Sequence, residues 1–138
     1  MKHLEFFVSG SPKGQPRPRA FARAGKARVY DPGTAEGWKG QVALAAQLHR
    51  PADPIETPAA VYLRFSFRRP RGHYGKRGLR PGAPPAHMSK PDVDNLAKAV
   101  LDALVEIGFL RDDRLVWLLF VTKGYTESSP GCSVRLTW

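Results

Sequence analysis

Apolar and polar residues alternate along residues 60–67, so that Val61 and every second residue after it are apolar. This period of two predicts a strand with one buried face. Residues 115–122 are apolar on both faces, which predicts a strand in the middle of a sheet with both of its sides covered. The remaining candidate strands are residues 4–9, 28–30 and 132–138.

Residues 92–107 give the clearest helical pattern, because their apolar side chains form one stripe and their polar side chains line another face. Gly108 is suited to end this helix. A second helix is predicted from about Thr34 to His49, where apolar residues recur at helical spacing. Together these elements predict an α/β (α+β) fold over residues 1–138, a small single domain with two main helices and a mixed, mostly antiparallel sheet.

The chain carries 22 Lys and Arg residues against 12 Asp and Glu, a net charge of +10. Such a surface attracts polyanions, which leaves ribosomal, DNA-binding and nuclease functions open. Cys132 is the only cysteine, so an intrachain disulfide is excluded and a reducing compartment fits. The first residues lack the apolar core of a signal peptide, and the longest apolar run is too short to span a membrane. We therefore expect a cytoplasmic protein.

Two basic segments contain no acidic residue and are rich in proline and glycine. Residues 10–28 begin with prolines that exclude a regular helix, and residues 68–87 are too poor in apolar groups to be packed. Each is either a solvated surface loop or a contact for DNA phosphates, and the second is expected to become ordered only on a partner. The candidate DNA-binding residues are Arg17, Arg19, Arg68, Arg69 and Arg71.

Half of the acidic residues lie between Asp92 and Asp113. Asp92 and Asp94 stand where the helical pattern begins, and at a helix start their carboxylates can converge on one point. The alternative is that both only cap the helix and complement its dipole. Asp112 and Asp113 precede the apolar strand and are either an ordinary turn or further ligands. Local spacing alone does not bring Asp113 back to the start of the helix.

Lys98 lies four residues after Asp94 and four before Asp102. It can form ion pairs on the helix surface, or it can direct a cation at a scissile phosphate. Carboxylate oxygens suit Mg²⁺ or Mn²⁺, which bridge to substrate phosphates and activate water. The four histidines are scattered, so the ligand clusters typical of zinc are missing. The acidic stretch of this basic chain therefore indicates a metal-dependent nuclease.

The same stretch resembles a known family signature. Residues 90–104, Lys-Pro-Asp-Val-Asp-Asn-Leu-Ala-Lys-Ala-Val-Leu-Asp-Ala-Leu, and residues 108–113, Gly-Phe-Leu-Arg-Asp-Asp, are similar in order and spacing to RusA-type Holliday-junction resolvases. Members of that family are small homodimeric Mg²⁺-dependent endonucleases that nick two strands symmetrically at four-way DNA junctions. The chain departs from the pattern at Leu115, where many relatives carry Gln, and at residues 89–91, where some carry a run of arginines that residues 68–80 can supply here.

By position, the resemblance implies that Asp92, Asp94 and Asp113 bind the metal and that Lys98 is the catalytic lysine. It thus implies the convergence of Asp113 that spacing leaves open. It also implies an endodeoxyribonuclease that acts on branched DNA as a homodimer. Three more residues match signature positions without an assigned role: Asn95, Asp102 and Asp112.

Two other functions stay open. One is a non-catalytic basic DNA-binding protein whose aspartates only cap and turn, and the other is a flap or branched-DNA nuclease that uses the same site. Lys98 favours an enzyme, because capping requires no lysine at that spacing. A two-fold homodimer suits an enzyme that makes two paired nicks. Val134, Leu136 and Trp138, beside the predicted strand at residues 115–121, offer an apolar surface for it, unless the core of one chain buries them.

Overall fold

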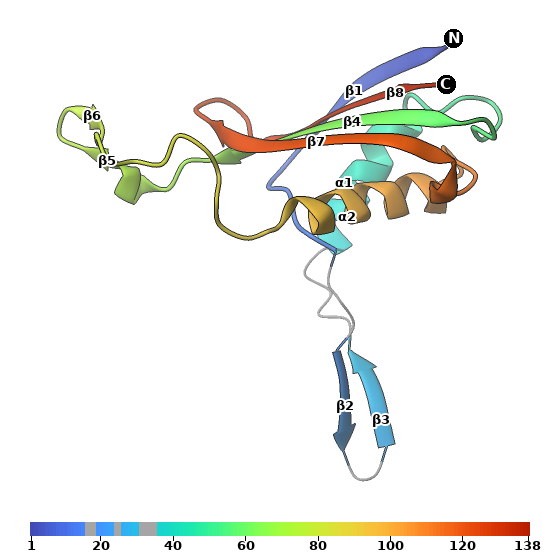
Figure 1. The fold of residues 1–138 in the computed structure, drawn as a ribbon, viewed down its shortest axis with the longest axis horizontal. Coiled ribbons are helices and arrows are strands. Elements are labelled where there is room, and N and C mark those ends of the chain that lie inside the picture. Colours follow the sequence, from blue (N-terminus) through green and yellow to red (C-terminus); the bar gives the residue numbers. More distant parts are fainter. Residues whose placement is uncertain (16–18, 24–25, 31–35) are drawn as a thin grey trace.

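The computed structural model describes residues 1–15, 19–23, 26–30 and 36–138, and Figure 1 shows its ribbon. Among these residues, no helix has the length and apolar content needed to cross a membrane. The elements follow one another as β1 (His3–Ser9), β2 (Arg19–Arg23), β3 (Lys26–Tyr30), α1 (Glu36–Gln47), β4 (Ala59–Arg68), η1 (Arg71–His73), β5 (Tyr74–Gly75), β6 (Gly78–Leu79), α2 (Val93–Glu106), η2 (Asp113–Leu115), β7 (Val116–Thr126) and β8 (Gly131–Thr137).

Four strands form the main sheet in the order β1-β8-β4-β7. Strand β8 is antiparallel to both β1 and β4, whereas β4 and β7 are parallel. Helices α1 and α2 lie on one face of this sheet (Figure 1). The predicted fold class is therefore confirmed, with two helices and a mixed, mostly antiparallel sheet. Strands β2 and β3 form a separate antiparallel pair, as do the short β5 and β6.

The hydrophobic core lies between the helices and the sheet. Helix α2 buries a stripe that includes Leu96, Val100 and Leu104, because side chains three or four residues apart share one face of a helix. Strand β4 contributes Leu63 and Phe65 to the same core, at the alternate positions that the sequence predicted. Burying these two apolar faces against each other is what holds α2 on the sheet.

The bounds of the predicted elements mostly agree with the structure. Helix α2 begins one residue after the predicted start, and Gly108 ends it with a φ of 74°, in the left-handed region that glycine adopts without steric cost. Helix α1 ends at Gln47 rather than His49, and its predicted start lies outside the described residues. The predicted strand at residues 28–30 falls within β3, whereas β2 was not predicted.

Strand β7 is an edge strand, so the prediction of a central strand at residues 115–122 is wrong. In the part of the chain that the structure describes, it pairs with β4 alone, and the side chains of Trp117, Leu119 and Phe120 are 68%, 44% and 58% exposed. A strand with apolar residues on both faces is buried on both sides only if other elements of the fold cover both faces of its sheet. Here the helices cover one face of the sheet, and β4 and β8 take the central positions.

Residues 68–87, called the basic arm below, are packed at their base, contrary to the prediction of an unpacked loop. The arm extends beyond one end of the sheet and contains η1, β5 and β6 (Figure 1). The guanidinium of Arg69 lies 4.3 Å from the ring centroid of Tyr125 in β7. The ring of His87 stacks on Phe67, with 4.1 Å between centroids. Stacking of a guanidinium and of an imidazole on aromatic rings thus holds both ends of the arm against the sheet. The prediction missed these contacts because it considered only the aliphatic residues of the segment.

Candidate active site on helix α2

Two aspartates stand exposed at the start of α2. Asp92 is the N-cap residue, and its carbonyl oxygen accepts a hydrogen bond from the amide of Leu96 at 3.0 Å. Its carboxylate makes no capping hydrogen bond, so capping does not explain this side chain. Asp94 lies in the first turn, where the helix dipole favours a negative charge. The structure therefore places two exposed carboxylates at one end of the helix.

The segment around these aspartates is held from two sides by residues far away in the sequence. From β7, the ammonium of Lys123 donates to the carbonyl oxygens of Ser89 at 2.6 Å and Pro91 at 2.9 Å. From the loop after β1, the amide of Gln15 donates to the carbonyl oxygen of Asn95 at 2.8 Å. The sequence reasoning missed these contacts. For Lys123 a signal exists, namely a lysine at a helix-facing position of a largely apolar strand.

The close approach of the loop after β1 explains the glycine within it. A Cβ added to Gly14 would lie 3.0 Å from the Cβ of Asn95 and 3.2 Å from the Cβ of Pro91, tighter than ordinary van der Waals contact. Glycine therefore lets the backbone of this loop lie directly against the start of α2. Gly14 and Gln15 belong to the first basic segment, so this part of the segment passes directly beside the candidate site.

Lys98 joins two acidic side chains on the exposed face of α2. Its ammonium lies 2.9 Å from a carboxylate oxygen of Asp102 and 3.2 Å from one of Asp113. Hydrogen bonds to Asp102 and then to Asp113 raise the pKa of Lys98 above its usual value, so the side chain stays positively charged. The contact with Asp102 is the helix-surface ion pair that the spacing allowed. The contact with Asp113 places this residue beside the middle of the helix.

Asp112 and Asp113 have different environments although they are adjacent. A carboxylate oxygen of Asp112 accepts a hydrogen bond from the amide of Arg114 at 2.9 Å, and so caps the short helix η2. For Asp112, therefore, the prediction of an ordinary turn residue is the one that agrees with the structure. Asp113 is the first residue of η2 and points toward Lys98. Of this pair, Asp113 is thus the residue whose carboxylate contacts Lys98.

The three carboxylates expected to share a metal ion are Asp92, Asp94 and Asp113. Among the described residues, no three His, Cys, Asp or Glu side chains lie close enough together to hold an ion. Asp113 contacts Lys98 and lies near Asp102, and from Asp94 to Asp102 a helix rises by about 12 Å. The oxygen donors have the chemistry that Mg²⁺ prefers. For all three to bind one ion, the carboxylate of Asp113 must leave Lys98 and move toward the start of α2.

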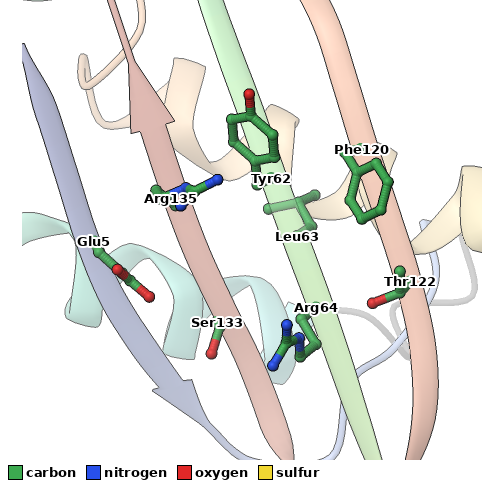
Figure 2. Close-up of a pocket in the computed structure, with 8 residues that line it drawn as sticks. All are labelled: Glu5, Tyr62, Leu63, Arg64, Phe120, Thr122, Ser133 and Arg135. Atoms are coloured by element: carbon green, nitrogen blue, oxygen red, sulfur yellow. The ribbon is translucent and has the colours of Figure 1, made fainter.

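Two surface hollows help to delimit the site. The first, of about 240 Å³, lies beside Asp113, and its lining residues are Asp102, Val105, Glu106, Arg111, Asp112 and Asp113. The second, of about 200 Å³, lies on the face of the sheet away from the helices, as Figure 2 shows. There the guanidinium of Arg135 lies 4.3 Å from the ring centroid of Tyr62. None of the candidate catalytic residues lines the second hollow, so it is separate from the candidate site.

The candidate DNA-binding arginines fall into three groups. Arg17 lies outside the described residues, and Arg19 lies in β2, where the backbone alone is described. Arg68 and Arg71 are exposed at the base of the basic arm. Arg69 is half-buried, because its guanidinium stacks on Tyr125 and donates to the carbonyl oxygen of Pro84 at 2.7 Å. The arm carries three further exposed cations, Lys76, Arg77 and Arg80.

Comparison with known proteins extends the similarity well beyond the acidic stretch. The family model described as Endodeoxyribonuclease RusA matches residues 9–137. A protein of Bacillus subtilis (strain 168), described as "Uncharacterized protein YqaN", is 35% identical over 130 residues, which cover 92% of this chain and 91% of that protein. The family match therefore includes both basic segments and every strand from β2 onward.

Proposed function

Because this chain belongs to the RusA family of endodeoxyribonucleases, which resolve Holliday junctions, we propose that it cuts four-way DNA junctions by paired, symmetric nicks in a Mg²⁺-dependent reaction. The observation that best supports an active site is the position of Lys98 between Asp102 and Asp113, on the exposed helix face that begins at Asp94. Neither capping of α2 nor the turn before β7 requires a lysine at this place.

In this proposal Asp92, Asp94 and Asp113 hold the ion, and Mg²⁺ suits the donors as well as Mn²⁺ does. When bound, the metal supplies a Lewis acid that activates water and neutralises charge on the phosphodiester. Lys98 keeps Asp113 on the face of α2 until DNA and metal are present. Its ammonium, still paired with Asp102, is then available to the scissile phosphate.

The basic arm and the loop after β1 supply the surface that binds the DNA backbone. Arg68 and Arg71 are exposed on the arm and free of carboxylates in their own segment, and Arg17 and Arg19 follow the loop that lies against α2. Arg69 contributes by keeping the arm in place, since its guanidinium is engaged within the protein. Phosphate contacts of this kind give affinity that depends on salt rather than on sequence.

We further propose that the enzyme is a homodimer, since one site per chain cuts one strand and resolution needs two nicks. The surface suggested from the sequence needs correction: Val134 and Leu136 are 0% exposed and belong to the core of one chain. Exposed apolar side chains occur on several elements, including Leu44 of α1, and the edge strand β7 carries two large ones, Trp117 and Phe120. They are candidates for burial between two subunits. A location in the cytoplasm stays a prediction from the sequence.

The test is incubation of the purified protein with labelled DNA, with and without Mg²⁺. Three substrates of equal length distinguish the alternatives: a mobile four-way junction, a flap and a linear duplex. The proposal predicts cleavage of the junction in Mg²⁺ and little cleavage of the other two. Preference for the flap would support the branched-DNA nuclease. Binding of all three without cleavage in Mg²⁺ or Mn²⁺ would support a non-catalytic DNA-binding protein.

A further inference from the structure

Lys123 occupies an unusual place for a charged residue. It lies on β7 opposite Phe65 of β4, which is 1% exposed, and two residues after Val121, which packs against the core. Residues i and i+2 of a strand share a face, so the stem of Lys123 leaves the sheet on the side of the helices. An ammonium at the margin of a core is costly unless hydrogen-bond acceptors replace its water.

The acceptors that Lys123 finds are backbone carbonyls. Its ammonium reaches the oxygens of Ser89 and Pro91, which flank Lys90 and immediately precede Asp92. Hydrogen bonds from a charged donor are short and about twice as strong as neutral ones. Two bonds to carbonyls two residues apart fix the direction of the backbone between them. The chain therefore enters α2 in an orientation that Lys123 sets from the neighbouring strand.

The other side of the same segment is held differently. Gln15 bonds to the carbonyl of Asn95, and Gly14 packs against Asn95 and Pro91. These contacts act on the first turn of the helix and on Pro91, whereas Lys123 acts only on residues before the helix. Asp92 stands between the two attachments.

From this geometry we infer that Lys123 is a positioning residue for the reaction: by holding the carbonyls of Ser89 and Pro91, it sets the backbone from which Asp92 and Asp94 present their carboxylates to the metal. The inference rests on the proposed function, because it assigns these two carboxylates to metal binding. Lys123 acts through the backbone and contacts neither the ion nor the phosphate. Removing a group that orients metal ligands typically lowers metal affinity or activity by about 10- to 100-fold.

The first experiment measures hydrogen exchange in the metal-free protein, which requires no activity. Lys123→Met keeps the aliphatic stem and removes the donors, and Lys123→Arg restores donors. Lys39→Met is the matched control, because Lys39 has a largely buried stem but pairs with Glu106, near the other end of α2. We expect faster exchange over residues 88–96 in Lys123→Met, near-normal exchange in Lys123→Arg and no change there in the control.

The second experiment measures the response to Mg²⁺. In Lys123→Met, the Mg²⁺ concentration for half-maximal junction cleavage should rise by about 10-fold or more, and the rise in melting temperature on adding Mg²⁺ should shift to higher concentration by the same factor. Junction affinity measured without metal should stay within about twofold of wild type, because the substitution is not on the proposed DNA-binding surface. Lys123→Arg should recover most of the Mg²⁺ response.

Unchanged exchange over residues 88–96 together with an unchanged Mg²⁺ midpoint in Lys123→Met would overturn the inference. Should that variant fail to fold, Lys123→Gln provides the same test, since its amide is too short to reach both carbonyls. An inactive wild-type protein would defeat the proposed function instead. Hydrogen exchange would then still decide whether Lys123 holds the segment, and the melting response to Mg²⁺ would decide whether it does so for metal binding.

Discussion

The basic arm offers a prediction in which neighbouring arginines have different effects. Arg68 and Arg71 are exposed, whereas Arg69 stacks on Tyr125 and donates to Pro84. If Arg68 and Arg71 each neutralise one DNA phosphate, replacing both by Ala should reduce the slope of log K against log salt by about 1.8, at about 0.9 per contact. Between 50 and 200 mM salt, the affinity of the double variant should then fall about 12-fold less than that of wild type.

Arg69→Ala should act on the structure of the arm instead. It removes a stacked guanidinium and a charged hydrogen bond, together about 2 kcal/mol of local stability for a half-buried group. We therefore expect faster hydrogen exchange in residues 68–87 and a change in the salt slope well below one unit. Global unfolding should change little, because the arm lies outside the hydrophobic core.

The assay is fluorescence anisotropy of a labelled four-way junction, titrated at several KCl concentrations without Mg²⁺. Lys2→Ala combined with Arg50→Ala is the control, because both residues are exposed outside the two basic segments and the pair removes the same net charge. An unchanged slope in the Arg68 and Arg71 variant would place the DNA-binding surface elsewhere. A slope that falls in Arg69→Ala as much as in the double variant would show that Arg69 contacts phosphate directly.

Three further predictions concern stability, thiol reactivity and assembly. Burial lowers the pKa of His87, and the charge of Lys123 lowers it further, so at this position the folded protein binds fewer protons than the unfolded chain. The stability that neutral His87 contributes should therefore be present above pH 6.5 and be lost as the pH falls below it. His87→Phe should remove that part of the pH dependence of the melting temperature. Burial raises the pKa of Cys132 to about 12, so a thiol reagent should not label the native protein at pH 8 but should label it fully in denaturant. Light scattering should give twice the chain mass of 15.3 kDa, and a mass near 15.3 kDa with and without junction DNA would refute the dimer and its paired nicks.

The sequence predicted those features that depend on local pattern. The apolar stripe of α2 and the alternation in β4 are set by the periods of a helix and a strand, and both elements are where they were expected. The pairing of Lys98 with Asp102 likewise follows from one helical turn. The two exposed carboxylates at the start of α2 also follow from sequence order, since Asp92 and Asp94 flank the first helical residue.

Features that depend on how distant segments meet were not predictable in this way. The contact of Asp113 with Lys98 depends on where the chain runs after it turns at Gly108, and spacing alone left that position open. Strand β7 was placed in the middle of the sheet because its apolar residues resemble those of a buried strand, whereas the order of strands puts it at the edge. The bonds from Lys123 to the residues before Asp92 cross from one element to another; the local pattern marks Lys123 as an unusual lysine in an apolar strand but does not identify its partners.

The central claim is that the carboxylates of Asp92, Asp94 and Asp113 serve Mg²⁺-dependent cleavage of a junction. The most direct measurement compares wild type with Asp92→Asn, Asp94→Asn and Asp113→Asn on a labelled mobile four-way junction in Mg²⁺, with binding measured in parallel. We predict two symmetric nicks by wild type and none by the variants, which should bind the junction as tightly or more tightly because each has lost a negative charge facing DNA. Cleavage within about threefold of wild type by all three variants would contradict the assignment of this site.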